Sequence, residues 1–257
     1  MLVTLGSNST IGAGASQTFQ YACNSFQKLY IRIDDDGTDS LDAHITVQIG
    51  NEVICNDINA RPLGYISFLN SGGAVATAEA VFAIDFGSHI LDPLENLYVT
   101  IRNADGSNSV TAVDVSAIVN EGGVYSPIKY TNYSDSVFTD SNTLSIYAWA
   151  DATMVNDTTA FTVRNQSYSA TPQVQSGVNV AQSMLFVEGT SSPVGNIAKL
   201  ADNQVPLDTS VNYDTASAID GVVCISAMSK QPSKASASRK AGQAVLQSMT
   251  SAERKAL

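Results

Sequence analysis

The sequence predicts an all-β protein built from two tandem jelly-roll β-sandwiches, followed by a short basic helical tail. Apolar and polar residues alternate in many short segments, which is typical of antiparallel strands that bury one face. Turn-forming residues separate these segments at short intervals, as they do in sandwiches and barrels. Helix-forming residues in an amphipathic order follow near the C-terminus.

Residues 15–120 predict the first sandwich. In segments such as KLYIRID and HITVQIG every second residue is apolar. The pair Gly50-Asn51 lies between two of these segments, and a Gly-first pair favours a two-residue type II′ hairpin. YISFL at 65–69 is interpreted as a further strand, and we expect no helix in this half. About eight strands in roughly 105 residues fit a jelly roll or a similar sandwich.

The second half repeats the architecture without repeating the sequence. Gly122, Gly123 and Pro127 indicate a linker. Strand patterns then resume, with long polar loops expected around 150–158 and 200–220. The predicted organisation is an N-terminal arm at 1–14, a first jelly roll at 15–120, a linker at 121–128, a second jelly roll at 129–229 and a basic helical tail at 230–257.

Charge is distributed unevenly along the chain. The whole sequence carries −11, whereas residues 230–257 carry +5 and the remainder therefore −16. The tail is interpreted as one or two short amphipathic helices, and Thr250 and Glu253 form a capping-box pattern. A basic tail on an acidic body indicates nucleic acid, an anionic membrane or another subunit as its partner, and a merely solvated tail is the alternative. The basic residues concerned are Lys230, Lys234, Arg239, Lys240, Arg254 and Lys255.

The segment IRIDDDGTDS places a dense group of aspartates at a predicted strand end. When Gly37 takes the invariant sixth position of an EF-hand loop, Arg32 and Ala43 fall at the first and twelfth positions, where the loop needs carboxylates. An EF-hand is therefore excluded. A solvated loop and a Ca²⁺ site at a subunit junction remain as alternatives. The candidate Ca²⁺ ligands are Asp34, Asp35, Asp36 and Asp39.

Little in the sequence supports catalysis. His44 and His89 are the only histidines, and no nucleophile elbow, zincin or P-loop motif occurs. We therefore expect no catalytic residues and no enzyme, although carboxylate pairs for glycoside hydrolysis depend on spatial separation and stay open.

Other side chains of chemical interest have structural interpretations. Tyr147 and Trp149 share one face of LSIYAWAD, where they form either a sugar-stacking platform or packing against a neighbouring element. Cys23, Cys55 and Cys224 lie in or beside apolar runs without metal-like spacing, which predicts buried free thiols.

The sequence also bears on localisation. The opening MLVTLGSNSTIGAGASQTF has no basic region before its short apolar run, so we expect no secretory signal. No apolar stretch approaches the roughly 18 residues that a membrane span requires. Synthesis in a cytoplasm is the expectation.

Three segments carry a family resemblance: AGASQTFQYACNSFQKLYIRI, DAHITVQIGNEVICND and SPIKYTNYSDSVFTDSNTLSIYAW. With the tandem sandwiches of residues 15–229, they resemble the double jelly-roll major capsid proteins of tailless, membrane-containing icosahedral bacteriophages of the corticovirus and finnlakevirus type.

The resemblance implies a virion structural protein made in the host cytoplasm. Three subunits would form a pseudo-hexameric trimer, and trimers would tile an icosahedral shell over an internal membrane. The tail would contact that membrane or minor capsid proteins on the inner face, and a penton protein would be a further partner. No sequence-specific nucleic acid is expected. The alternative is a carbohydrate- or receptor-binding sandwich, such as a spike or adhesin.

Overall fold

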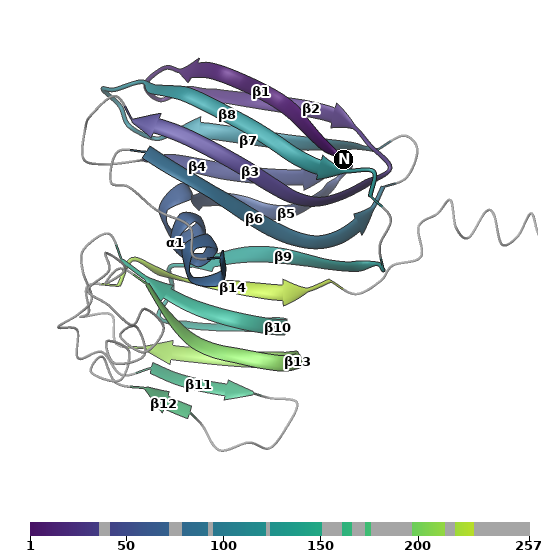
Figure 1. Ribbon diagram of the computed structural model, residues 1–257. Helices are drawn as coiled ribbons and strands as arrows, with labels where there is room; N and C mark the ends of the chain where they lie inside the picture. Colours follow the sequence, from purple (N-terminus) through teal and green to yellow (C-terminus); the bar gives the residue numbers. More distant parts are fainter. Residues whose placement is uncertain are drawn as a thin grey trace, which may run out of the picture.

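The computed structural model describes residues 1–35, 42–71, 79–91, 95–121, 124–150, 161–165, 173–175, 197–213 and 219–228. These residues form an all-β protein with one helix (Figure 1). The strands of the first half are β1 Leu2–Ile11, β2 Ser16–Ala22, β3 Ser25–Asp35, β4 Ala43–Ile49, β5 Glu52–Asn59, β6 Glu79–Ile90, β7 Asn96–Asn103 and β8 Val110–Val119, with α1 Ala60–Ser71 between β5 and β6. Those of the second half are β9 Ser126–Tyr133, β10 Val137–Trp149, β11 Phe161–Asn165, β12 Gln173–Gln175, β13 Ile197–Tyr213 and β14 Gly221–Ala227.

The first half is a jelly roll. One sheet has the strand order β1-β8-β3-β6 and the other the order β2-β7-β4-β5, and every neighbouring pair is antiparallel. Apart from the β4–β5 hairpin, successive strands alternate between the two sheets, which is the double Greek key of eight-stranded jelly rolls. Strand β4 shows why the sequence folds this way, since its burial alternates strictly between buried and half-buried residues.

The second half reaches the same topology with fewer described strands, because β10 and β13 are long and each contributes to both sheets. Strands β10 and β13 pair along their length, but the register shifts between Asp140 and Ser145. The ribbon bends there. Beyond the bend β10 also pairs with β14, and β14 pairs with β9, whereas the other end of β13 pairs with β11 and β11 pairs with β12. The two halves of the ribbon thus contribute to opposite sheets, and one jelly roll results.

The two rolls share an apolar core. Strand β14 is buried on both faces, with Val222 and Cys224 in the core of the second roll and Val223 and Ile225 in the core that continues into the first. This explains the apolar run VVCI at 222–225. Helix α1 lies between the rolls in Figure 1 and contributes Leu63 to the shared core.

The N-terminal segment differs from the arm predicted at 1–14. Strand β1 pairs with β8 and is the first strand of the first jelly roll. Most of its residues are exposed or half-buried, and its register shifts between Thr4 and Gly6, between Gly6 and Ser9 and between Ser9 and Ile11. An edge strand with bulges lacks regular alternation, so the sequence pattern was not visible. The second roll likewise begins inside the predicted linker, since β9 starts at Ser126.

YISFL belongs to α1, so its interpretation as a strand was wrong. The Asn59 side chain caps the helix by accepting a hydrogen bond from the Arg61 N–H at 2.9 Å, and Pro62 occupies the first turn. The Ser67 hydroxyl accepts a hydrogen bond from the Ala83 N–H of β6 at 2.9 Å. The helix therefore covers the edge of a sheet, and tertiary packing outweighs the weak helical pattern.

The polar loop expected around 200–220 was also wrong in part, because β13 runs through to Tyr213. Its polar side chains have partners within the ribbon: the Thr209 hydroxyl lies 2.7 Å from that of Thr143, and Asn203 Nδ2 donates to the Thr143 carbonyl at 3.0 Å. Hydrogen bonds of this kind let polar residues occupy a strand.

Candidate assembly surface

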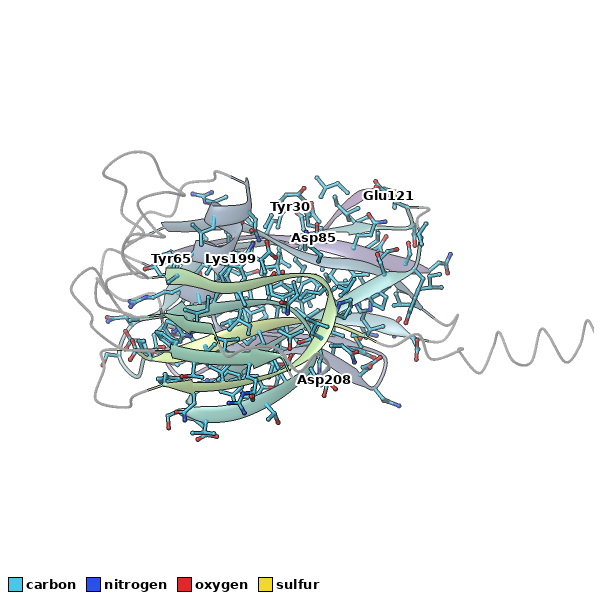
Figure 2. All side chains as sticks on the ribbon, turned by 90° about the horizontal axis from the view of Figure 1, so that it is seen from below. Tyr30, Tyr65, Asp85, Glu121, Lys199 and Asp208 are labelled. Carbon is cyan, nitrogen blue, oxygen red and sulfur yellow. The ribbon has the colours of Figure 1, made fainter. Side chains whose placement is uncertain are left out.

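The fold gives the molecule two different ends. One end carries the short connections and bends at 23–24, 50–51, 141–142 and 203–206. It also carries the crossing between the rolls at 120–125. We call this the turn end; it also carries the N-terminus and the end of β14 (Figure 1). The opposite end, here the loop end, carries the longer connections of both rolls. Figure 2 shows Glu121 at the turn end and Tyr65 of α1 toward the loop end.

Exposed apolar side chains concentrate at the turn end. Nine large apolar side chains are exposed among the described residues, and six of them lie there. These six are Met1, Leu2, Val53, Ile90, Val124 and Val205. Val124, between the two rolls, is 86% exposed. Exposed apolar groups gathered on one face mark a contact surface more often than scattered ones do.

The junction between the rolls depends on aromatic packing. Phe86 of β6 lies with its ring centroid 5.3 Å from that of Phe26 and 5.3 Å from that of Tyr130 on β9. The Tyr130 hydroxyl donates to the Asp85 carbonyl at 2.8 Å, and burial raises the pKa of Tyr130. His89 Nε2 lies 3.3 Å from the Ile128 carbonyl, and burial lowers the pKa of this histidine. The rolls cannot separate without exposing this cluster, so the chain holds its two sandwiches at a fixed offset.

Tyr147 and Trp149 do not form an exposed platform. They are 1% and 6% exposed, and both belong to the core shared by the rolls. Trp149 Nε1 donates to Asn132 Oδ1 at 3.0 Å, and the Tyr147 hydroxyl lies 3.4 Å from Asn70 Oδ1 of α1. The platform hypothesis is therefore wrong for these residues, because the sheet that carries them faces the first roll and not solvent.

The predicted Ca²⁺ ligands are only partly located. Asp34 pairs with Glu79 on β6 and Thr111 on β8, and β3 ends at Asp35. Asp36 and Asp39 lie outside the described residues. Among the residues that the structure describes, no group of three or more His, Cys, Asp or Glu side chains is arranged to hold a metal. The Ca²⁺ site stays a prediction.

The basic tail at 230–257 lies outside the described residues, so the structure places none of its lysines or arginines. The three cysteines are buried and unpaired, as predicted. Burial raises the pKa of the Cys23 thiol to about 11, which leaves it unreactive at neutral pH. No helix in the described part of the chain is long and apolar enough to span a bilayer.

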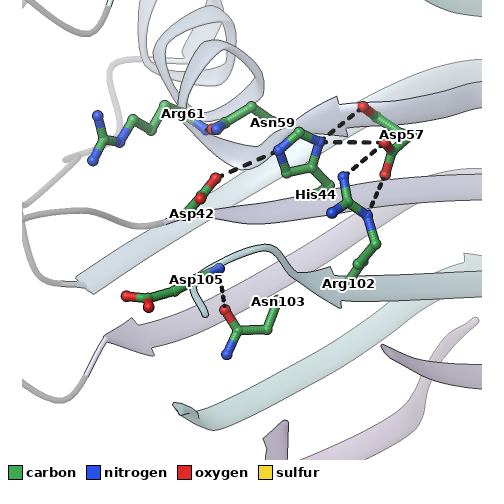
Figure 3. A network of polar contacts seen from close by, with 8 residues as sticks. All are labelled: Asp42, His44, Asp57, Asn59, Arg61, Arg102, Asn103 and Asp105. Atoms are coloured by element: carbon green, nitrogen blue, oxygen red, sulfur yellow. Dashed lines mark hydrogen bonds and ion pairs between the residues drawn. The ribbon is translucent and has the colours of Figure 1, made fainter. Parts of the chain in front are cut away.

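A polar network that the sequence did not predict occupies the outer face of the second sheet of the first roll (Figure 3). Arg102 donates to both oxygens of Asp57, at 3.0 and 2.8 Å. His44 Nδ1 lies 3.0 Å from the Asp57 carbonyl, and His44 Nε2 lies 3.5 Å from Asp42 Oδ1. The hydrogen bond from Arg102 lowers the pKa of Asp57. Asp57 has a φ of 48°, the kind of bulge that alternation cannot reveal.

This network predicts a pH-dependent contribution to stability. Since the folded-state pKa of Asp57 lies below its usual value near 3.8, its stabilisation is present above that value and is lost as pH falls through the folded pKa. Both side chains are more than a third exposed, so solvent screening limits the coupling to about 1 kcal/mol at pH 7. A double-mutant cycle of Arg102→Gln and Asp57→Asn, measured by urea unfolding, should show a larger coupling at pH 7 than at pH 2.5. Equal coupling at both pH values would contradict the assignment.

Sequence reasoning also missed a buried carboxylate. Asp140 is 4% exposed, and it accepts hydrogen bonds from the hydroxyls of Tyr133 at 2.8 Å, Thr143 at 2.6 Å and Ser226. The signal was present in the alternation, because Phe138 and Asp140 fall on the same inward face of β10. A charged residue at an inward position requires polar partners, and here three strands supply them.

Comparison with known proteins places the fold. Neither a protein-family model nor a curated protein matches the chain. Among solved structures, the major capsid protein of STIV is 10% identical, with 87% of this chain and 94% of that chain covered and a TM-score of 0.55. The major capsid protein P2 of bacteriophage PM2 is 11% identical, with 90% and 98% covered and a TM-score of 0.53. A chain from the atomic structure of Sulfolobus turreted icosahedral virus is 12% identical, with 88% of each chain covered and a TM-score of 0.51. The predicted all-β double jelly-roll fold is therefore confirmed, and it is a fold that viral major capsid proteins share.

Proposed function

We propose that this protein is a major capsid protein that self-assembles into the shell of an icosahedral virus. The observation that carries the proposal is the tandem pair of jelly rolls, similar over nearly the full length of the chain to viral major capsid proteins. The likeness extends over both rolls and their crossing, which favours shared architecture over the chance similarity of one sandwich.

The geometry suits a pseudo-hexameric trimer. Each subunit contributes two rolls with the same strand topology, fixed to each other by the Phe86–Tyr130 cluster. Three copies around a threefold axis bring six similar sandwiches into a ring, and such a unit tiles a closed shell. Closed rings use heterologous contacts, in which one surface of a subunit meets a different surface of the next.

The finer partners are proposed from the charge of the tail and from the family resemblance. The tail at 230–257 is proposed to lie on the inner side of the shell, where its cations meet the anionic headgroups of an internal membrane or minor capsid proteins. A penton protein is proposed at the fivefold vertices, and assembly would follow synthesis in the host cytoplasm. Ca²⁺ at Asp34, Asp35, Asp36 and Asp39 is proposed as an option. It predicts a lower midpoint of thermal unfolding when a chelator is added.

The test is the mass and outline of the purified protein. We expect size-exclusion chromatography with light scattering to give three times the 27.0 kDa of one chain, and negative-stain images to show particles of hexagonal outline. A monomer or an elongated trimer that binds glycans on an array would instead favour the receptor-binding alternative. The buried Tyr147 and Trp149 leave that alternative without the aromatic platform it required.

A further inference from the structure

A surface hollow of about 430 Å³ lies near the turn end, where the first roll meets the start of β9. Val124 and Ile118 line it, together with Ser88 and Ser126. Ser88 is 7% exposed, and its hydroxyl is the only buried side-chain polar atom without a hydrogen-bond partner in the described part of the chain. Val124, which is 86% exposed, gives this hollow an apolar wall that a further segment can bury.

The charges around the turn end indicate the sign of that segment. Carboxylates outnumber cations near its connections: Glu52 follows the 50–51 turn, Glu95 precedes β7, Glu121 lies at the crossing between the rolls and Asp208 follows the 203–206 bend. The N-terminal ammonium pairs with Glu121, and Lys28, which lines the hollow, lies 3.4 Å from Asp85 Oδ2. Asp208 Oδ1 accepts a hydrogen bond from the Asn142 N–H at 3.2 Å. Exposed apolar side chains surrounded by carboxylates favour a cationic amphipathic partner and disfavour direct contact with an anionic lipid surface.

The chain itself supplies such a segment at the same end. Strand β14 ends there, and the Met228 N–H donates to the Pro127 carbonyl at 2.9 Å, next to Ser126 of the hollow. The 29 residues that follow combine six cations with one apolar helical face. A helix of that length would extend about 43 Å, and an extended chain about twice as far. The apolar positions are Val245, Met249, Ala252 and Ala256.

We propose that residues 229–257 dock along the turn end of their own subunit. The apolar positions cover the hollow beside Val124 and Ser88, and some of the cations lie near the carboxylates. The remaining cations face away from the body, where they are available to an inner-shell partner. This inference deepens the proposed function by naming what the tail binds first, and it does not require that trimers form.

The test uses the full-length chain and limited trypsin digestion, which cleaves after lysine and arginine. Docking should protect Lys234, Arg239 and Lys240 from cleavage. Val124→Asp places a carboxylate at the hollow on a side chain that is 86% exposed, so the fold is not at risk. We expect this variant to be cleaved in the tail at least tenfold faster. Val137→Asp is the matched control, since Val137 is 65% exposed but lies at the loop end, and its cleavage rate should equal that of the parent.

Two further measurements separate the alternatives. Carbodiimide cross-linking of the full-length protein should join tail lysines to Glu52, Glu95 or Glu121 within a band of monomer mass. Equal cleavage of the parent and the Val124→Asp variant would overturn the proposal. A second result would also overturn it: Val124→Asp abolishes flotation with anionic vesicles, while the tail stays protected from trypsin. The turn end would then be a surface that contacts lipid. Light scattering on the same samples tests trimer formation separately, so failure of the proposed function and failure of docking give different results.

Discussion

Replacing Gly87 by alanine is expected to destabilise the protein by about 3–5 kcal/mol. Gly87 has a φ of 68°, and a Cβ built there would lie 1.9 Å from the Ser126 carbonyl oxygen. The colliding atom belongs to the backbone of β9, at the bridges that join Gly87 to Pro127 and Ser88 to Ser126. Because the clash is with a backbone atom, no change of side-chain rotamer can relieve it, and the two rolls must shift apart. The left-handed φ adds about 1–2 kcal/mol for any residue with a Cβ.

Gly12→Ala is the control for this substitution. No atom lies within 4 Å of a Cβ built at Gly12, so the variant should stay within about 0.5 kcal/mol of the parent. Urea unfolding of both variants measures the difference. Trp149, the only tryptophan, lies in the core shared by the rolls, so its fluorescence reports their junction. If Gly87→Ala were as stable as Gly12→Ala, the junction would not depend on close backbone approach.

Where an element depends on residues that are close in sequence, the sequence predicts the fold well. The hairpin between β4 and β5 has the predicted two-residue turn, with Ile49 opposite Glu52 and a positive φ of 56° at Gly50. Strand β4 alternates strictly and Gly50 supplies the turn, whereas β5 departs from alternation at its Asp57 bulge. The jelly-roll fold class follows from the number and spacing of such strands.

Where structure depends on a distant partner, the sequence predicts it poorly. Helix α1 has little amphipathic order, and its position depends on the edge of β6, to which Ser67 bonds. Phe86 and Tyr130 are 44 positions apart, and nothing in either local pattern indicates that their rings meet. The exposed apolar residues of the turn end are unpredictable for the same reason, because Leu2 of β1, Val124 of the crossing and Val205 of β13 come from separate parts of the chain.

Asp140→Ala is expected to destabilise the second roll by about 3–5 kcal/mol. The carboxylate is buried and accepts three hydrogen bonds, each of which is worth about 1.5–3 kcal/mol when the acceptor is charged. Its removal leaves the hydroxyls of Tyr133, Thr143 and Ser226 without their acceptor. These residues come from β9, β10 and β14, so the carboxylate joins three strands at the point where the β10–β13 ribbon bends.

Two variants test this explanation against a general effect of removing charge. Asp202→Ala removes a carboxylate that is 65% exposed and paired with Lys199 at 2.7 Å, so it should cost less than about 1 kcal/mol. Tyr133→Phe deletes one donor and leaves the other two bonds, so its cost should be about 1 kcal/mol. The free energy of unfolding, measured in urea by Trp149 fluorescence, should therefore be clearly lower for Asp140→Ala than for either of these two variants. A loss in Asp140→Ala no greater than in Asp202→Ala would contradict this explanation. The bend would then be fixed without the carboxylate, by the backbone pairing of β10 with β13 and by the hydrogen bonds of Thr143 with Thr209 and Asn203.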